Sequence, residues 1–476
     1  MGKIIEQTIN RFDGGMTNDK RSKSTNKFSF ASGFDVFSYN HKLVPRNGSE
    51  DKNTNSTNIV KFVYADRSGT VTLFGLDITA GKCVIKYFSD PGWAEPANNE
   101  SSSGTRKENV FFPYKDGIFM WGSDYLKRFD TGGGAFDDSY ENLAFGTTVA
   151  PPVHHPADDR AYFFVDNKVY SLNDTSWVGL VLTLPSNLKI VSACSYGNYL
   201  AIGCTTKNGI TKDDTSIVFL WDRDSSLETL TARPDFGTGQ LQFLGVLDNA
   251  LTAVVYTEYQ KEIAIKQLNG ETSRVIKTIS IDNSPAFGED YQIINNKMYF
   301  YMSAPLNSDN RKGIWVVDSL GRMALDFVAV VAGSALTYAL EGIYWTGAIW
   351  WFSYNSKAAR STSTASGISV LEPLIIGDGK NTFKLVKFAV LTEPLDANAT
   401  TSGIKLEVKA NTDSSYTTIF ENKGVRYSNR SEAVNIEATG VELPFFTELE
   451  TKITIDNRNI DIIGYYYKIE EVDDDL

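Results

Sequence analysis

The sequence is poor in the residues on which many enzymes and metal centres depend: its 476 residues include three histidines and three cysteines. Cys83, Cys194 and Cys204 are odd in number and widely spaced, so they predict neither a disulfide framework nor a CxxC metal site. They fit assembly in a reducing compartment. His154 and His155 are adjacent, and neighbours in an extended segment point to opposite sides. We therefore expect this pair to lie in a plain loop between two of the repeated β-sheet units (blades) that are predicted below, and to hold no metal ion.

Catalytic and cofactor motifs are also missing. The chain has no GxSxG nucleophile elbow, no P-loop and no HExxH or HxH spacing. We therefore predict no catalytic residue, no cofactor site and no metal site, and we expect that the protein is not an enzyme. Glycosidase chemistry needs only two carboxylates roughly 5–10 Å apart. Such a pair requires no sequence motif, so the sequence leaves this chemistry open.

Long hydrophobic runs and positive charge are scarce as well. The longest uncharged, mainly apolar run covers the fourteen residues 327–340, fewer than the roughly 20 that a spanning helix needs. The net charge is −12. An acidic chain disfavours specific nucleic-acid binding, because phosphate contacts are mainly electrostatic. We expect neither a transmembrane segment nor a nucleic-acid site.

Aromatic residues, by contrast, are abundant, with 28 Phe, 23 Tyr and 8 Trp, and this composition favours strands. From about residue 58 to 375 a turn followed by an aromatic-rich strand recurs with a mean spacing of about 46 residues, at 69–75, 116–122, 159–166, 197–203, 248–255, 295–301 and 346–352. Such a period is typical of β-propeller blades. Blades packed radially bury each sheet against the next. We predict an all-β protein with a propeller of about seven blades; unrelated hairpins in stacked sandwiches are the alternative.

The two ends of the chain differ from this repeat. We predict an extended N-terminal arm over residues 1–57, the propeller over 58–377, and a β-sandwich or jelly-roll-like domain over 378–476. The last domain is predicted from longer alternating strands at 383–391, 403–409, 416–421, 433–438, 451–456 and 460–469.

The arm has nine basic and six acidic residues among its first 55, and five phenylalanines, without a sustained period of 2 or 3.6. A segment of this kind cannot form a core alone, so we expect it to dock onto a neighbouring subunit or another protein. Docking onto its own globular body is the alternative. Gly14 and Gly15 would permit a sharp turn at the docking site. The candidate interaction residues are Arg11, Phe12, Gly14, Gly15, Lys20, Arg21, Phe28, Phe30, Phe34 and Phe37.

Two segments carry a resemblance to a known class of proteins. Arg11-Phe-Asp-Gly-Gly-Met-Thr-Asn-Asp-Lys-Arg21, with the Phe-rich stretch to Arg46, resembles the start of virion structural proteins of tailed bacteriophages. The closing strand Ile460–Glu470 is similar to the last strand of sandwich domains in phage tail proteins.

This resemblance implies a tail hub or nozzle component, assembled in the host cytoplasm and located in the virion. It implies a ring-like oligomer around the DNA exit path, contacts with other tail proteins, and only passive contact with DNA during ejection. Two other functions stay open: a module that binds host-surface glycan, and a glycan-cleaving enzyme.

Overall fold

The structure is a computed structural model of the full chain, and within its described part it contains strands and no helix. Consequently no helix there is long and apolar enough to cross a membrane. The described residues are 3–12, 15–16, 27–32, 34–37, 43–46, 49–52, 58–79, 82–95, 100–101, 106–122, 125–142, 149–174, 176–206, 215–224, 232–306, 309–328, 330–331, 334–335, 340–355, 357–362, 368–373, 375–392, 403–411, 413–423, 431–435, 443–456 and 460–472.

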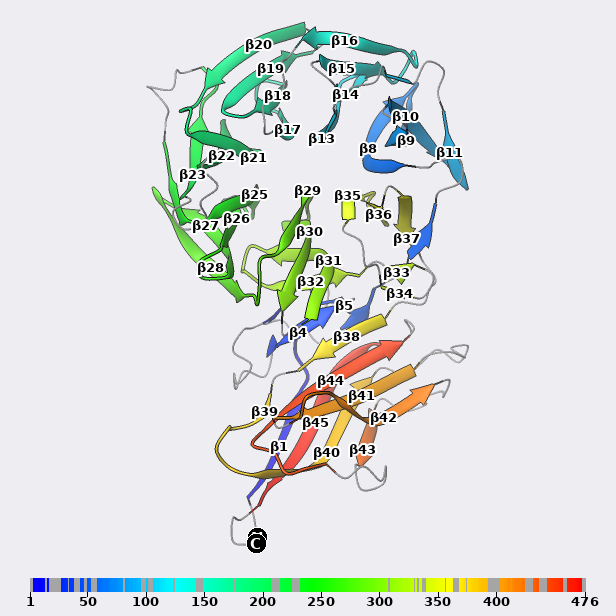
Figure 1. The fold of residues 1–476 in the computed structure, drawn as a ribbon, viewed down its shortest axis with the longest axis vertical. Coiled ribbons are helices and arrows are strands. Elements are labelled where there is room, and N and C mark those ends of the chain that lie inside the picture. Colours follow the sequence, from blue (N-terminus) through cyan, green and yellow to red (C-terminus); the bar gives the residue numbers. More distant parts are fainter. Residues whose placement is uncertain are drawn as a thin grey trace.

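Residues 59–361 form a propeller-like ring of small strand groups, antiparallel within each group and running outward from the middle of the ring, and some neighbouring groups are joined into larger sheets (Figure 1). The first of these sheets are β8 (Ile59–Arg67), β9 (Thr70–Thr79), β10 (Lys82–Ser89) and β11 (Gly92–Ala94), with β12 (Glu100–Ser101) beside β10; β13 (Arg106–Tyr114), β14 (Gly117–Gly122), β15 (Tyr125–Asp130) and β16 (Phe136–Asn142); and β17 (Val149–His155), β18 (Arg160–Val165), β19 (Lys168–Asn173) and β20 (Ser176–Thr183).

The ring continues with β21 (Leu188–Tyr196), β22 (Tyr199–Thr206), β23 (Thr215–Trp221) and β24 (Asp235–Thr238); β25 (Gln240–Leu247), β26 (Ala250–Thr257), β27 (Glu262–Asn269) and β28 (Thr272–Ser280); β29 (Ala286–Ile294), β30 (Lys297–Leu306), β31 (Asp309–Asp318) and β32 (Met323–Phe327); and β35 (Leu340–Trp345), β36 (Trp350–Tyr354) and β37 (Lys357–Ser361). A short pair, β33 (Val330–Val331) and β34 (Ser334–Ala335), connects the last two groups.

Each of the recurrences seen in the sequence overlaps the second strand of one of these groups: β9, β14, β18, β22, β26, β30 and β36. The preceding turns explain the signal. Asp248 and Asn249 have φ of 49° and 62°, and Asn295 and Asn296 have φ of 50° and 58°. Two successive positive φ values are the geometry of a two-residue hairpin turn, which favours Asn, Asp and Gly.

The last group of the ring takes its fourth strand from the other end of the chain. β7 (Ser49–Asp51) pairs antiparallel with β37, with Glu50 opposite Arg360, and Arg360 Nε donates to Glu50 Oε1 over 2.7 Å. On the inner side, a Cβ at Gly342 of β35 would lie 2.3 Å from the Val60 carbonyl oxygen of β8. This close approach requires glycine, so the first and last groups of the ring meet directly.

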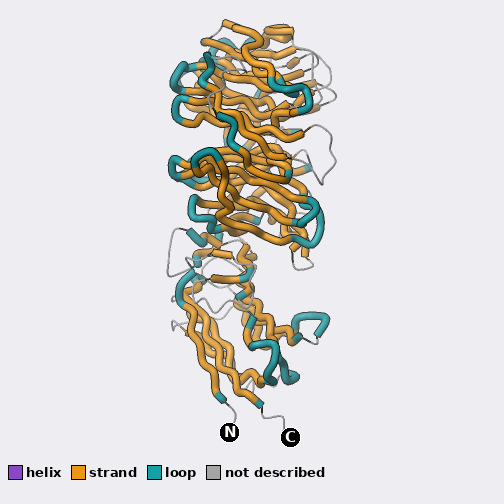
Figure 2. Tube along the Cα trace, turned by 90° about the vertical axis from the view of Figure 1, so that its left-hand side faces the viewer, coloured by secondary structure: helices purple, strands orange, loops and turns teal. Residues whose placement is uncertain are grey.

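Below the ring lie further antiparallel strands in two sheets (Figure 2). One sheet has the order β1 (Ile4–Ile9), β45 (Ile462–Glu471), β40 (Phe383–Thr392), β43 (Ser431–Asn435). The other contains β38 (Ile368–Glu372), β44 (Glu448–Asp456), β41 (Gly403–Ala410) and β42 (Thr417–Lys423), with β39 (Ile376–Gly377) beside β44. All six strands predicted after residue 378 overlap observed strands. Since β38 also pairs with β44, the lower sheets begin near residue 368, earlier than the predicted boundary.

A short strand of the arm joins the ring to the lower part. β4 (Phe30–Ser32) pairs parallel with β32 of the ring, with Ser32 opposite Leu325, and antiparallel with β38, with Ser32 opposite Val370. One continuous sheet therefore runs from β29 through β4 to β42. The arm also contains β2 (Gly15–Met16) paired with β3 (Lys27–Phe28), and β5 (Phe34–Asp35) paired with β6 (Val44–Pro45).

The five phenylalanines of the arm are buried inside the chain itself. Four of them, Phe12, Phe28, Phe30 and Phe34, are 0% exposed, and Phe37 is 8% exposed. They belong to one hydrophobic cluster with side chains of the ring and of the lower sheets. This burial corrects the expectation that they fill grooves on a neighbouring subunit, because the junction between ring and lower sheets already occupies them.

The other predicted arm residues are placed as follows. Arg11 is exposed, and Gly15 lies in β2. Gly14, Lys20 and Arg21 lie outside the described residues.

We expect removal of residues 1–50 to prevent folding. It deletes β1, β4 and most of β7, and each fully buried phenylalanine contributes about 1.5–3 kcal/mol, so four of them approach the total stability of a domain, about 5–15 kcal/mol. Removal of residues 1–10 alone, which deletes only the edge strand β1, should lower the melting temperature without abolishing cooperative unfolding. Thermal melts followed by circular dichroism would check both. A protein lacking residues 1–50 that melts like the full chain would contradict this expectation.

Candidate functional site

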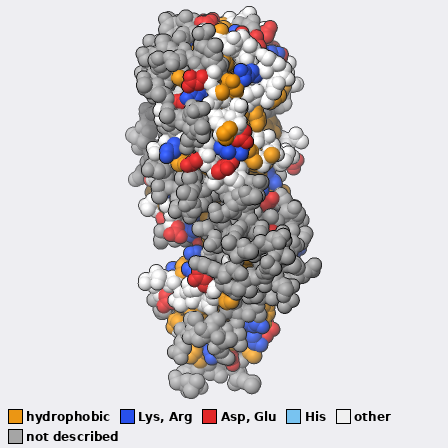
Figure 3. Space-filling model, turned by 90° about the vertical axis from the view of Figure 1, so that its right-hand side faces the viewer, with side chains coloured by type: hydrophobic (Ala, Val, Ile, Leu, Met, Phe, Trp, Pro, Cys, Tyr) orange, Lys and Arg blue, Asp and Glu red, His pale blue; other side chains and the backbone are white. Residues whose placement is uncertain are grey.

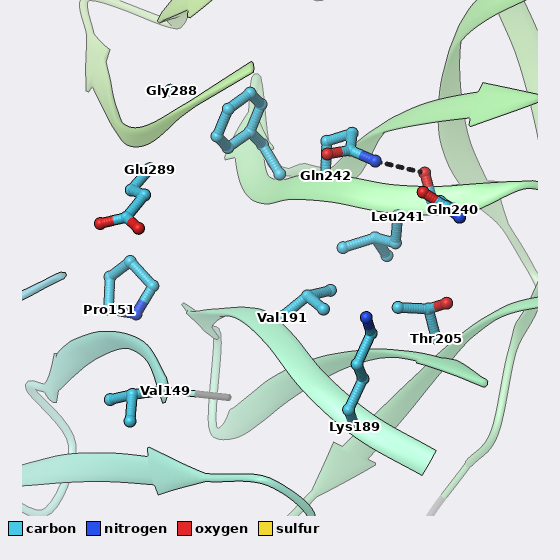
Figure 4. A pocket seen from close by; sticks show the side chains of 11 residues that line it. Val149, Pro151, Lys189, Val191, Thr205, Gln240, Leu241, Gln242, Gly288 and Glu289 are labelled. Atoms are coloured by element: carbon cyan, nitrogen blue, oxygen red, sulfur yellow. Dashed lines mark hydrogen bonds between the residues drawn. The ribbon is translucent and has the colours of Figure 1, made fainter. Parts of the chain in front are cut away.

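The middle of the ring holds a pocket of about 230 Å³ between the inner strands β17, β21, β25 and β29 (Figure 4). It is lined by Val149, Pro151, Lys189, Val191, Thr205, Gln240, Leu241, Gln242, Phe243, Gly288 and Glu289. Inner strands converge here because each sheet of the ring begins at its centre. The pocket thus collects polar side chains from three neighbouring strand groups: Lys189 and Thr205 from β21 and β22, Gln240 and Gln242 from β25, and Glu289 from β29.

Three polar side chains dominate this pocket. Lys189 and Glu289 enter from different sides (Figure 4). The Gln242 amide donates to the backbone oxygen of Gln240 over 3.4 Å. These groups can hydrogen-bond a small polar molecule. The lining contains no histidine or cysteine, so it lacks the common nucleophile–base pairs.

An ion cluster borders the pocket. Lys61 of β8 places its Nζ 2.6 Å from Asp290 Oδ1 and 3.6 Å from Glu289 Oε2. The Lys61 side chain is only 5% exposed, so its charge is compensated by these carboxylates. The cluster ties β8 to β29 across β35 and stabilises the closed ring.

The two adjacent histidines end a strand rather than lying in a loop, which corrects the sequence interpretation. As expected, they point opposite ways: His154 is exposed and His155 is 0% exposed. Arg223 Nη1 donates to His155 Nδ1 over 2.9 Å. Since arginine is always a donor, the ring proton sits on Nε2, which donates to the Tyr199 carbonyl over 3.0 Å. Both ring nitrogens of His155 are engaged, and neither is available to a metal.

The surroundings of His155 form a buried polar network. The Tyr162 hydroxyl donates to Asp158 Oδ2 over 2.5 Å, and Arg223 Nη1 lies 3.2 Å from Asp158 Oδ1. Burial raises the pKa of Tyr162 and lowers the pKa of His155. The network connects β17, β18 and the end of β23, and all its members bind one another, so its role is structural.

Metal-binding groups are not assembled elsewhere in the described part of the chain: no group of three or more His, Cys, Asp or Glu there could hold an ion. None of the three cysteines forms a disulfide bond. Burial raises the pKa of the Cys194 and Cys204 thiols, which disfavours the thiolate that a nucleophile requires.

One face of the molecule can be searched for a basic patch in Figure 3. On the face drawn in Figure 3, the described acidic and basic side chains lie interspersed over the ring. Phosphate backbones are bound by fields of positive charge, and this face shows none among the side chains drawn in colour.

Sequence reasoning missed the pocket residues Lys189, Gln242 and Glu289. Each lies in an inner strand that also carries other polar residues, and no motif surrounds it. These residues share one property, which is that each lies on the first, innermost strand of its strand group. That property could have indicated the pocket only if the strand order had been known.

No family model and no curated protein matches this chain. Among solved structures, it is similar to the β-propeller domain of Cps50 (Swd1) from Myceliophteria thermophila, with 12% identity, 64% of this chain and 97% of that chain covered, and a TM-score of 0.42.

Two further solved structures are more distant. The extracellular domain of a one-component system from B. thetaiotaomicron has 10% identity, covers 88% of this chain and 64% of its own, and gives a TM-score of 0.41. An exo-β-1,3-galactanase from Phanerochaete chrysosporium has 12% identity, covers 90% and 100%, and gives a TM-score of 0.28. With every TM-score below 0.5, these likenesses carry no argument about activity.

We expect the stability of the protein to fall as the pH drops below 6.5, in part through His155. Its lowered pKa keeps the native ring neutral, whereas the unfolded ring takes up a proton near its ordinary pKa of 6.5. The stabilising contribution is therefore present above pH 6.5 and lost below it, by at most about 1.4 kcal/mol per pH unit. Urea unfolding between pH 7.5 and 5.5 would measure this slope.

His155→Gln should reduce that slope, although the substitution itself costs about 1–3 kcal/mol by disturbing buried hydrogen bonds. The matched control is Ser176→Ala, because Ser176 is exposed on β20 and carries no titratable group, so this variant should keep the slope of the unsubstituted protein. Equal slopes for the unsubstituted protein and His155→Gln would contradict the role of His155.

Proposed function

We propose that this protein is a structural component of a bacteriophage virion, of the tail hub or nozzle type, without catalytic activity. In this proposal it is a seven-bladed propeller with a β-sandwich below it. It assembles into a ring-like oligomer around the DNA exit path and contacts other tail proteins.

The blade number is supported by the order of the sheets. Counting β7 as the outer strand of the last blade, each blade has four main strands, and the blades begin with β8, β13, β17, β21, β25, β29 and β35. Gly342 of β35 lies against Val60 of β8, where the circle closes. For the sandwich, buried residues of both lower sheets, such as Phe388 and Ile453, share one hydrophobic cluster.

The observation that carries the proposal is the joint made by β4. The segment that resembles virion proteins is the one that forms the continuous sheet from ring to lower part. Sheets linked by backbone hydrogen bonds and a common core resist bending, so the molecule is one elongated body rather than two tethered domains. A protein that transmits force within a virion needs to resist bending between its domains, whereas an enzyme does not.

The outer strand β20 supports contacts with other subunits. It is the edge of its sheet, and Val178 and Leu180 are 49% and 51% exposed on it. Proteins usually protect such edges with charge or proline, because an exposed apolar edge pairs with other chains. We propose this edge as a contact between neighbouring copies of the chain.

The charge of the molecule fits passive contact with DNA. The net charge of −12 and the interspersed charges of Figure 3 would let a duplex pass without binding tightly, since tight binding requires many phosphate contacts from Lys and Arg.

The proposal is tested by removing the protein from the particle. An amber mutation in the encoding genome, complemented in a suppressor host, should give particles with defective tails in the non-suppressing host. Electron microscopy and mass spectrometry of purified particles would check this. Normal, infectious tails that lack the chain would contradict the proposal.

The oligomer is tested separately on the purified protein. Light scattering after size exclusion should show an assembly larger than the 52.7 kDa monomer. The double substitution Val178→Lys and Leu180→Lys should shift it toward the monomer, while the control Val275→Lys, on the outer strand β28 of another sheet, should not. A monomeric unsubstituted protein would contradict the ring.

A further inference from the structure

The two charged side chains that line the central pocket are open to a ligand. They are Lys189 of β21 and Glu289 of β29, the charged residues among its described lining. Lys189 is partly exposed, and its Nζ forms no hydrogen bond or ion pair with another described residue. The Glu289 side chain is 60% exposed. Both groups are therefore accessible to a small molecule in the pocket.

The side of the pocket at Glu289 carries a surplus of negative charge. The neighbouring ammonium of Lys61 lies 2.6 Å from Asp290 Oδ1 and 3.6 Å from Glu289 Oε2. One ammonium thus faces two carboxylates and balances the charge of only one. Because the closer contact is with Asp290, the Glu289 carboxylate keeps the capacity to bind a further cationic group. On the Lys189 side, the pocket has a positive charge without a counter-charge among the described residues.

The two charges stand at different sides of the pocket, with uncharged lining between them. In Figure 4, Glu289 lies beside Pro151, Lys189 extends toward Leu241, and Val191 lies between the two charged side chains in this view. A molecule in the pocket therefore meets a positive side, an uncharged and mainly apolar middle, and a negative side.

A second pocket, of about 160 Å³, differs from the central one because its ion pair is satisfied within the chain. It lies where the β29–β30 and β35–β36 hairpin turns approach the arm, and Asn295 and Trp350 are among its lining residues. Asp326, with a side chain 1% exposed, accepts a hydrogen bond from Arg46 Nη2 over 2.6 Å. Lys297 places its Nζ 4.9 Å from the centre of an aromatic ring of the arm. The accessible opposite charges are thus in the central pocket.

We propose that the central pocket binds a short zwitterion, an ω-amino acid or a dipeptide, with its carboxylate on Lys189 Nζ and its ammonium on the Glu289 carboxylate. A ligand with only a negative charge would pair with Lys189 but face the unbalanced carboxylate, and a ligand with only a positive charge would face the ammonium of Lys189. Such like-charge contacts disfavour binding. The volume of about 230 Å³ is below the roughly 300–1,000 Å³ of pockets for drug-sized ligands, which limits the zwitterion to a short one.

The probes are 4-aminobutyrate, 6-aminohexanoate and glycylglycine, which differ in the separation of their two charges. Butyrate and 1-butylamine are the matched analogues of 4-aminobutyrate, because each keeps the carbon chain and only one of the charges. Saturation-transfer NMR titrations of the full chain at pH 7 should detect at least one zwitterion, with a dissociation constant on the order of 1 mM, as expected for so few ligand atoms. Butyrate and 1-butylamine should bind at least about tenfold more weakly than that zwitterion.

Two substitutions test the two ends of the site separately. Lys189→Met should weaken binding of the zwitterion at least about tenfold and remove its advantage over 1-butylamine. Glu289→Gln should weaken it by a similar factor and remove its advantage over butyrate, while Asp290 keeps its contact with Lys61. The matched controls are Lys168→Met and Glu271→Gln, at exposed positions outside the pocket, which should leave binding unchanged. Circular dichroism would confirm that each variant is folded.

This inference does not depend on the proposed structural role, because it concerns the folded monomer alone. It is overturned if no zwitterion gives saturation transfer at about 50 mM, or if butyrate or 1-butylamine binds the unsubstituted protein as tightly as the zwitterions. It is also overturned if folded Lys189→Met and Glu289→Gln bind the zwitterion like the unsubstituted protein, or if either control substitution removes binding.

Discussion

Closing the ring is the constraint on which the rest of this structure depends. A four-stranded sheet with two apolar faces cannot bury both by itself, so each sheet needs a neighbour on either side. At the end of the ring the chain supplies only β35, β36 and β37, and β7 completes the group from the far end of the sequence. Glycine at position 342 lets the last inner strand reach the first. The last group of the ring is therefore complete only with the N-terminal arm in place.

The N-terminal arm also forms the junction between the ring and the lower sheets. Phe28, Phe30 and Phe34 fill it, and the backbone of β4 pairs on both sides. The ion pair of Arg46 with Asp326 lies beside this junction. Asp326 is fully buried whereas Arg46 is partly exposed, and losing the pair would leave the buried carboxylate without its counter-charge. The pair therefore favours one position of the arm over others. An apparently irregular segment is thus the most constrained part of the molecule.

The candidate binding positions follow from the same architecture. Inner strands converge on the central pocket, and neighbouring hairpin turns frame the pocket of Asp326. In both places the polar groups come from several strands and are held by packing and ion pairs rather than by a local motif. Among the described residues, ion pairs and amide side chains line both pockets. Such groups can hydrogen-bond a ligand, and they also hold neighbouring strands in place. His155, Cys83 and Cys204 are buried among other side chains.

The sequence by itself determined the strands. Turn residues such as Asn295 and Asn296, followed by aromatic runs, mark the second strand of each sheet, because hairpin turns and alternating burial depend on neighbours in the chain. The pairing of segments far apart in the sequence could not be predicted in this way. Nothing local to residues 49–51 indicates pairing with 359–361, and nothing near Phe30 distinguishes its own core from a partner's groove. Only the tertiary structure decided that the arm closes the ring and that Arg46, Asp326 and Trp350 share a pocket, because these contacts join positions some 280 to 310 residues apart.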